Sequence, residues 1–563
     1  MTSVTEQGTP SAPTEETPEP YRHRWVALAA ILGVEVMDLL DGTIMNVAAP
    51  TIREDLGGGF TVIQWMTAGY TLPFAVLLIV GGRLGDMFGR KRMFLVGAAG
   101  FTLASLLCAV VQDPWQMIAA RALQGGLGAL MIPQGLGLIK TMFPRKEQAA
   151  AFGAFGPVMG LSAVGGPILA GFLIDTDLFD TGWRMVFLIN LPIGLATVFA
   201  ALRYLPEARV DSRPRLDLGG IVLVTTGVLL LVLPLVQGHE LDWPAWTFVM
   251  MAVAVVILAL FAWYEVRRER RGEAAVIELS LMRKPRFLAG LLVALVFFSG
   301  TAGMSLMLGV YLQAGLGWSP TRTAATMMPW ALFLVVGAIL TGAVLGAKLG
   351  RKALHLGLLV MIAGVLLMRY TVGRHHGDLS SWDMVPSVAV SGLGMGIMIG
   401  LLFDISLADV EPEESGTGGG VLTAVQQLGF GIGVALVGTV FFGFVGANAA
   451  ATVTGRESVV RTQLAEVGVP AGAQDQILAD LKRCLTDTEN QKDVAVTPES
   501  CQRGEPADAA VAQVVRAAGA DAHRRTFTDG IERSFLLVIG LLGLSFVLAF
   551  LLPPRAREES EGH

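Results

Sequence analysis

The sequence predicts an all-α membrane protein that crosses the bilayer many times. Of its 563 residues, 53% are hydrophobic and only 16% are charged, whereas a soluble domain carries about 25% charged residues. The mean hydropathy is +0.59. Glycine accounts for 68 residues, and glycine-rich apolar runs allow close helix packing in lipid. This composition excludes a soluble enzyme, a disordered protein and a nucleic-acid-binding protein.

Fourteen apolar runs are long enough to be membrane-spanning helices, because a helix needs about 20 mostly apolar residues to cross a bilayer. The alternating ten-residue segments of a membrane β-barrel do not occur. In chain order, the predicted spans are 25–48, 61–81, 93–111, 116–139, 148–173, 184–202, 217–236, 246–264, 287–311, 323–347, 353–368, 384–403, 417–446 and 534–552.

The basic residues between these spans predict the orientation, since cytoplasmic loops carry an excess of Lys and Arg. With the N-terminus inside, the inside segments contain 25 Lys and Arg residues, and the short outside loops contain four. We therefore expect both termini in the cytoplasm. Residues 1–24 lack an apolar core and a cleavage site, so they are predicted to be a disordered tail and not a signal peptide. Residues 553–563 form a second cytoplasmic tail.

The spans fall into three groups along the chain. Residues 25–204 contain six spans, residues 205–286 contain an extra pair and a basic cytoplasmic link, and residues 287–552 contain the last six. The link is the natural joint between the two halves, so a six-helix bundle is expected on each side of it. Its stretch 267–271 could bind anionic lipid head groups, but simple anchoring by the positive-inside rule explains it as well.

A polar outside loop at 447–532 interrupts the last group. Its stretches 457–467 and 473–485 have weak helical periodicity. The loop also holds Cys484 and Cys501, which on the outer face could pair as a disulfide or remain two free thiols.

Ionisable residues inside a span cost several kcal/mol, so each is a candidate functional residue. The first span contains Glu35, Asp38 and Asp41, and the fourth contains Arg121. Burial and mutual repulsion favour the protonated form of a carboxyl group, as a proton carrier requires, and a carboxylate also attracts cationic solutes. Arg121 must pair with a carboxylate or with backbone carbonyls. A purely structural ion pair is the alternative for all four.

One loop motif is highly specific. Residues 82–92 read GRLGDMFGRKR and lie between the second and third spans on the predicted inner side. The run matches G-x-L-x-D-x-x-G-R-K at every fixed position and resembles the loop signature of the major facilitator superfamily. The resemblance implies a major facilitator fold of two six-helix bundles. It also implies that this loop locks the cytoplasmic gate through Gly82, Asp86, Gly89, Arg90 and Lys91.

Further motifs resemble the 14-helix drug:proton antiporters of that superfamily. They are LDGTIMNVAAP at 40–50, RALQG at 121–125, GGPILAG at 165–171, WRMVFLINLPIG at 183–194 and VLTAVQQLGFGIGVALVGTV at 421–440. The resemblance implies that Asp41 is the acid that binds a proton or cation and that Arg121 tunes it. Glu35 and Asp38 lie outside the family motif and are additional candidates.

The same resemblance implies that Gly166, Pro167 and Gly171 form a bending point that favours export. Two departures weaken parts of the pattern. Ser162 stands where the fifth-helix motif usually begins with glycine, and Ala347 stands where the second-half gate loop would have an acid. The two gates are therefore expected to be unlike.

A substrate pocket would need apolar and aromatic walls. Seven side chains occur in spans where they could face such a pocket, although each could equally serve helix packing or lipid contact. They are Trp65, Tyr70, Phe74, Phe298, Met304, Tyr311 and Trp330.

The energy source is expected to be a proton gradient. An ATP-binding G-x-x-x-x-G-K-[ST] loop does not occur, since Lys140 and Thr141 follow Ile139 where glycine is required. No cofactor and no metal site are predicted.

These observations lead to one hypothesis: a bacterial multi-pass plasma-membrane protein, not an enzyme, that exports amphipathic, cationic drugs or antibiotics in exchange for protons by alternating access. Its expected partners are the small-molecule substrate, protons and the lipid bilayer, with no nucleic acid, and the chain is expected to be a monomer.

Three other functions stay open. An importer, or an exporter of one metabolite, is the nearest, and the fifth-span motif favours export. An intramembrane enzyme would need a G-x-G-D or H-E-x-x-H motif, and neither occurs. A membrane sensor would use the loop 447–532.

Overall fold

The computed structural model contains only helices in the residues it describes. These are residues 21–144, 147, 151, 155–177, 180–207, 217–238, 241, 243–271, 281, 283–375, 377–407, 410, 415–490, 498–503 and 508–552. Most of the predicted N-terminal tail, the C-terminal tail and the middle of the basic link lie outside the described residues.

Every predicted span coincides with a helix or a run of short helices. Within the described residues, twelve helices are long and apolar enough to cross a membrane. The other two predicted spans correspond to α1 and α6, which are not among these twelve. In chain order, the elements are α1 (Arg24–Leu56), α2 (Phe60–Phe88), α3 (Arg90–Val110), α4 (Pro114–Met142), α6 (Phe155–Thr176), η2 (Gly182–Arg184), α7 (Met185–Leu188), α8 (Asn190–Tyr204), α9 (Leu218–Gln237), α10 (Ala245–Glu269), α12 (Pro285–Val310), η3 (Tyr311–Gly315), α13 (Pro320–Leu340), η4 (Thr341–Leu345), α14 (Gly346–Leu349), α15 (Arg351–His375), α16 (Ser381–Ser406), α17 (Ser415–Gly455) and α21 (Ala509–Leu548).

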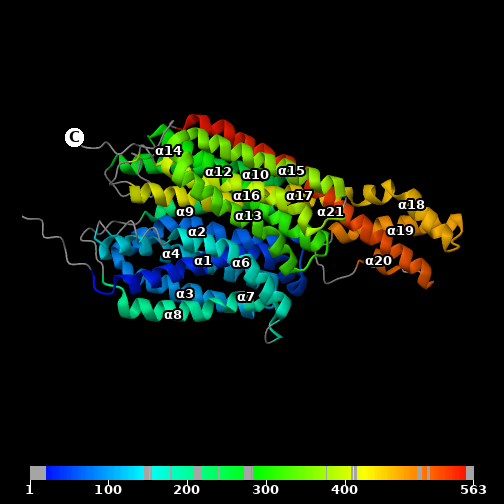
Figure 1. Cartoon of the computed structure of the whole chain (residues 1–563), viewed down its shortest axis with the longest axis horizontal. Helices are drawn as coiled ribbons and strands as arrows, with labels where there is room; N and C mark the ends of the chain where they lie inside the picture. Colours follow the sequence, from blue (N-terminus) through cyan, green and yellow to red (C-terminus); the bar gives the residue numbers. More distant parts are fainter. Residues whose placement is uncertain are drawn as a thin grey trace, which may run out of the picture.

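The helices run roughly side by side along one axis (Figure 1). In the first half, α4 packs against α2 and α3, and α1 packs against α6 and α8. In the second half, α16 packs against α13 and α15, while α12, α17 and α21 contact one another. The two halves meet where α2 packs on α17 and where α6 packs on α13. Both termini of the described chain lie at the same end of the bundle (Figure 1).

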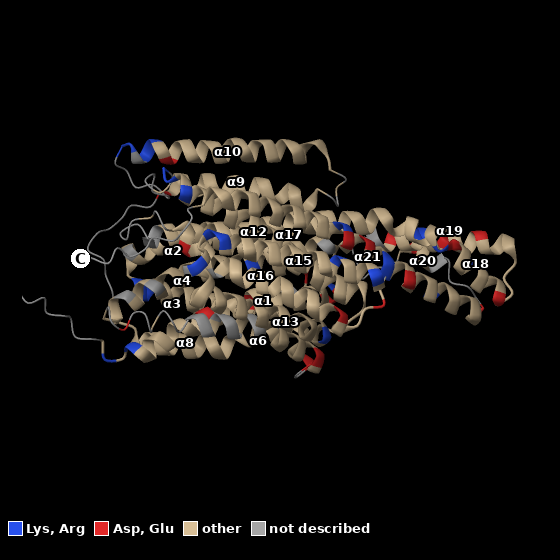
Figure 2. Cartoon of the chain, turned by 45° about the horizontal axis from the view of Figure 1, so that its top comes forward, with Lys and Arg blue, Asp and Glu red and all other residues tan. Residues whose placement is uncertain are grey.

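The extra pair, α9 and α10, lies at the edge of the bundle. Helix α9 contacts α2 and α17, whereas the main packing partner of α10 is α9 alone, as Figure 2 shows. Trp246, Phe248 and Val256 on α10 are among its many exposed apolar side chains. Such a surface matches a helix that faces lipid.

The predicted outside loop is mostly helical. Helices α17 and α21 continue well past the predicted spans, and α18 (Glu457–Glu466), α19 (Ala471–Asn490) and α20 (Glu499–Arg503) lie between them. The two stretches with weak helical periodicity, 457–467 and 473–485, coincide with α18 and α19. We call residues 447–532 the projecting domain, because this part extends beyond the bundle at the end opposite the termini (Figure 1).

The projecting domain has its own small apolar core, which explains why so polar a sequence folds. Val453, Leu464, Leu478 and Val511 are buried together there. Glu457 accepts hydrogen bonds from Arg461 of the same helix at 2.6 Å and from Lys482 at 3.1 Å, and the second contact joins α18 to α19. The two basic partners hold the pKa of Glu457 below its usual value.

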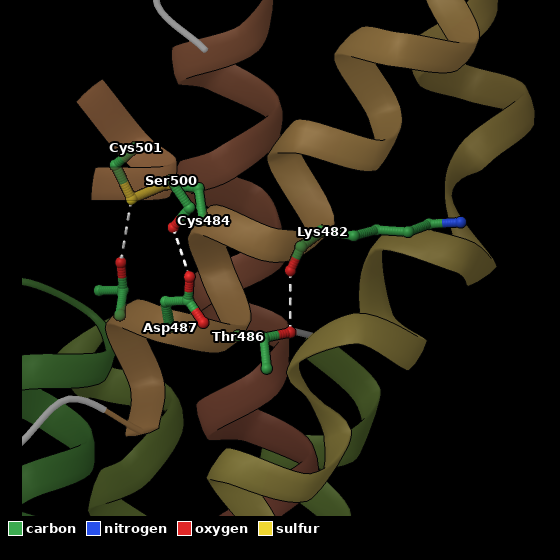
Figure 3. Close-up of a disulfide and its surroundings, with 7 residues drawn as sticks. Lys482, Cys484, Thr486, Asp487, Ser500 and Cys501 are labelled. Carbon is green, nitrogen blue, oxygen red and sulfur yellow. Dashed lines mark hydrogen bonds between the residues drawn. A yellow bond between two sulfur atoms is a disulfide. The ribbon is translucent and has the colours of Figure 1, made fainter. Parts of the chain in front are cut away.

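A disulfide joins Cys484 of α19 to Cys501 of α20 (Figure 3). Beside it, the Ser500 hydroxyl donates to a carboxylate oxygen of Asp487 at 2.5 Å.

Replacing both cysteines by serine should remove about 3 kcal/mol of stability from the projecting domain, because the disulfide closes a loop of 17 residues. Limited proteolysis at increasing temperature measures this loss of stability. Unchanged protease resistance would contradict it.

Candidate functional site

A buried ion pair lies in the middle of the first bundle. Helix α1 supplies Asp41 and helix α4 supplies Arg121, and the guanidinium Nη1 hydrogen-bonds the Asp41 carboxylate. The two side chains are 2% and 1% exposed. Arg121 also donates from Nε to the carbonyl oxygen of Met66 on α2 at 3.2 Å. The sequence-based expectation that Arg121 needs a carboxylate or a carbonyl is met by both.

Close helix contact brings these residues together. A Cβ atom on Gly125, one turn after Arg121, would lie 2.1 Å from the carbonyl oxygen of Tyr70 on α2. Only glycine therefore allows α4 to approach α2 so closely at this level. That approach places the Arg121 guanidinium 4.4 Å from the centre of the Tyr70 ring, within the range of a cation–π contact.

Further polar side chains form a hydrogen-bond network with the ion pair. Gln124 of α4 accepts a hydrogen bond from Arg121 Nη1 at 2.7 Å and donates from Nε2 to Asp41 Oδ1 at 2.8 Å. Its Nε2 also donates to Ser105 Oγ of α3 at 2.8 Å. Asn190, the first residue of α8, donates to the same Ser105 oxygen at 3.3 Å. Four helices thus contribute to one buried polar cluster.

A second carboxylate lies near the pair. Asp38 is half-buried and accepts a hydrogen bond from the Tyr70 hydroxyl. Because Arg121 stacks on the same tyrosine ring, Tyr70 connects Asp38 to the Asp41–Arg121 pair. Glu35, one turn earlier on α1, is also half-buried. The structure therefore brings Asp38, Asp41 and Arg121 into one cluster, with Glu35 at its edge.

The gate motif lies at the end of the bundle that carries the termini. Gly89 has φ +100°, a conformation that favours glycine, and it separates α2 from α3. Arg90 lies against α4, since a Cβ on Gly137 would come within 2.1 Å of its Nη1. Lys91 Nζ donates to the carbonyl oxygen of Leu202 at 3.0 Å. Gly82 is half-buried near Pro133, and the Asp86 side chain lies outside the described part of the structure.

The fifth-span motif lies where α6 meets α1 and α13. A Cβ on Gly166 would lie 2.1 Å from Thr43 Oγ1, and a Cβ on Gly171 would lie 2.7 Å from Thr321 Cα. Pro167 lies inside α6, between these two contacts. One turn beyond Gly171, the Asp175 carboxylate accepts a hydrogen bond from the Thr321 backbone N–H at 3.1 Å.

A further hydrogen bond joins the two bundles near the same end. Gln313 of η3 donates from Nε2 to the Val47 carbonyl oxygen of α1 at 3.0 Å. Together with the α6–α13 contact, it holds the two halves of the chain close at the end that carries the projecting domain.

The seven residues predicted to line a pocket are distributed over three packing clusters. Trp65 packs with Val228 and Val232 of α9, so it lies toward the peripheral helix pair. Tyr70 and Phe74 belong to the core of the first bundle. Phe298, Met304 and Tyr311 are buried in the largest core cluster, which includes residues of both halves, and Trp330 is half-buried against it. Hydrophobic residues in a span face many directions, and apolar character alone does not separate pocket from core.

Three polar residues of the cluster escaped the sequence-based prediction. Gln124 is the fourth residue of the RALQG motif, and Ser105 and Asn190 are single polar residues inside apolar spans. The signal for Gln124 is its position three residues after Arg121, which places both on one helix face. Ser105 and Asn190 offer no comparable signal.

Comparisons with known proteins identify the family. A family model described as Major Facilitator Superfamily matches residues 31–434. A probable actinorhodin transporter of Streptomyces coelicolor is 61% identical over 546 residues, which cover 97% of this chain and 94% of that protein. A tetracenomycin C resistance and export protein of Streptomyces glaucescens is 33% identical, with 75% of this chain and 77% of that protein covered.

Solved structures support the fold. A bacterial homologue of the human lysosomal transporter Spinster, in an inward-facing and occupied conformation, matches with a TM-score of 0.56 and 15% identity. The match covers 94% of this chain and 96% of the other. With its membrane-spanning helices, its loop motif and its two packed halves, the chain belongs to the major facilitator superfamily of multi-pass membrane transporters.

Proposed function

We propose that this transporter exports an antibiotic-like small molecule in exchange for protons. The observation that carries the proposal is the fully buried Asp41–Arg121 pair with Asp38 beside it. Ionisable side chains at such depth are costly and are retained chiefly for transport or proton relay. The export direction rests on relatives named as an actinorhodin transporter, a puromycin resistance protein and a tetracenomycin C resistance and export protein.

The coupling follows from competition between a proton and a cationic solute for the acidic side chains Glu35, Asp38 and Asp41. When Asp41 is ionised, it pairs with Arg121 and the site can accept a cationic solute near Glu35 and Asp38. A proton arriving from outside neutralises a carboxyl group, weakens the attraction for the solute and favours its release. A proton crossing a 100 mV potential supplies about 2.3 kcal/mol, before any pH gradient is added. No cofactor or metal is needed for this cycle.

The proposed movement is a rocking of the two halves around the central helices. The contacts of Gly171 with Thr321 and of Gln313 with Val47 close one end of the interface in this structure. In the opposite state, these contacts open and the loop at residues 82–92 locks the other end. We place the closed end outside the cell, in accord with the distribution of basic residues.

The test uses inverted membrane vesicles that contain the protein. An acid-inside gradient is imposed, ethidium is added as a cationic probe, and its fluorescence is followed before and after the gradient is collapsed by nigericin. We expect uptake that stops when the gradient collapses. Vesicles with folded protein that take up ethidium equally with and without a gradient would contradict proton coupling.

The second candidate is an exporter of one antibiotic or metabolite that excludes ethidium. The 61% identical relative named for a single compound favours it. A screen of structurally different compounds in the same vesicles separates the two: one accepted compound supports narrow specificity, and several unrelated cations support a broad one.

A further inference from the structure

Gln124 occupies an unusual place in the acid cluster. Its side chain is 0% exposed and touches both charges of the ion pair at once. The carboxamide oxygen accepts from Arg121 at 2.7 Å, and the carboxamide nitrogen donates to Asp41 at 2.8 Å. A carboxamide is a neutral group whose oxygen can accept from a cation while its nitrogen donates to an anion.

Ser105 fixes the orientation of this carboxamide. The second N–H of Gln124 donates to Ser105 Oγ at 2.8 Å. With both N–H groups engaged by acceptors, the oxygen is left to face the Arg121 guanidinium. Turning the amide over would place N–H groups against the cation and the oxygen against the carboxylate, and both contacts would be repulsive. The Asn190 amide, 3.3 Å from Ser105 Oγ, extends this support to α8.

From this geometry we propose that Gln124 is a positioning residue for proton coupling, and that Ser105 holds it in register. The inference rests on the proposed function. Gln124 holds both charges of the pair, and hydrogen bonds to charged groups are stronger than those between neutral groups. Gln124 therefore keeps Asp41 and Arg121 in the arrangement from which proton-driven transport proceeds. Its hydrogen bond with Arg121 also holds the guanidinium in place during the cycle.

Two substitutions test whether Gln124 positions the Asp41–Arg121 pair. Gln124→Leu removes the hydrogen bonds to Arg121 and Asp41 at similar volume, and Gln124→Glu replaces the donor to Asp41 by a second acidic group. Both variants remove the hydrogen bond from Gln124 that stabilises the charged pair. The pH at which gradient-driven uptake is half-maximal, measured on the acidic side of inverted vesicles, should rise by about one unit, since a hydrogen bond to a charged group contributes at least that much. Gln124→Glu should shift it further than Gln124→Leu.

Gln134→Leu is the matched control. Gln134 lies on the same helix, is also buried, and donates to the backbone carbonyl oxygens of Gly81 at 2.7 Å and Leu130 at 3.1 Å. Its loss should lower the maximal rate or the yield of folded protein without moving the half-maximal pH. A shift as large in Gln134→Leu would assign the effect to general destabilisation and overturn the proposal.

A milder variant covers the case in which the Gln124 variants do not fold. Ser105→Ala removes only the acceptor behind Gln124, and it should shift the half-maximal pH in the same direction by a smaller amount. The positioning role of Gln124 is overturned if folded Gln124→Leu has an unchanged pH profile. If neither Gln124 variant folds, an unchanged pH profile in Ser105→Ala overturns it. If the wild type itself shows no gradient-dependent uptake of any compound, the proposed function fails instead, so the two failures are distinguishable.

Discussion

Asp41→Asn is expected to abolish gradient-driven transport. Asparagine has the volume of aspartate but cannot bind or release a proton, so the coupling step is lost. The substitution also leaves Arg121 buried without its carboxylate, which typically costs about 3–5 kcal/mol. Uptake in inverted vesicles should therefore fall to the level of vesicles without the protein, and the midpoint of thermal unfolding should fall as well.

Two variants separate the loss of coupling from the loss of stability. Asp41→Glu keeps a titratable group within reach of Arg121 and should retain part of the transport. Asp217→Asn is the matched control: Asp217 is also buried, accepts from Tyr264 at 3.0 Å and lies 3.4 Å from Arg268, but it belongs to the peripheral helix α9. It should lower stability without abolishing transport. Full activity in folded Asp41→Asn protein would refute the assignment of Asp41.

Gly171→Val is expected to have the next largest effect. A Cβ atom at this position would lie 2.7 Å from Thr321 Cα and 2.8 Å from Thr321 N, and both are backbone atoms that cannot turn aside. Helix α6 and helix α13 would have to separate, and the hydrogen bond between Asp175 and Thr321 would break. The state in which this end of the bundle is closed would lose stability relative to the open state.

Transport should fall by about tenfold or more, since a shift of 1.4 kcal/mol between the two states already changes their ratio tenfold. The distance between spin labels on the ends of α6 and α13 should increase. Gly540→Val is the control, because no heavy atom lies within 4 Å of a Cβ placed at that exposed position of α21. If Gly171→Val left both the label distance and the transport rate unchanged, the closing role of this contact would be wrong.

The placement of the acid cluster shows what a sequence motif can and cannot locate. The Asp41–Arg121 pair was predictable, because two isolated charges of opposite sign in apolar helices must find partners in lipid. Tyr70 was predicted only as a candidate pocket residue. In the structure its hydroxyl donates a hydrogen bond to Asp38, and its ring makes a cation–π contact with Arg121. The direction in which a side chain points depends on how α2 rotates against α4, and helical periodicity does not report that rotation.

The helices of the projecting domain were also only partly predictable from the sequence. The weak periodicity of 457–467 and 473–485 was enough to predict α18 and α19. It was not enough to predict that α17 and α21 continue unbroken into the domain, because long polar helix segments carry no hydropathy signal once they leave the membrane. Their stability comes from a small shared core that includes Val453 and Val511, which are 58 positions apart and meet only in the folded chain.

By itself, the sequence determined the order of the helices, the membrane location, the family and the identity of the buried charges. These follow from hydropathy and from the high cost of charge in lipid, which are properties of each segment taken alone. Only the tertiary structure decided that Gln124 clamps the ion pair, that Trp65 faces α9, and that Gly171 lies against Thr321. Each of these contacts joins residues from different helices, and their geometry is set by helix packing that no single segment encodes.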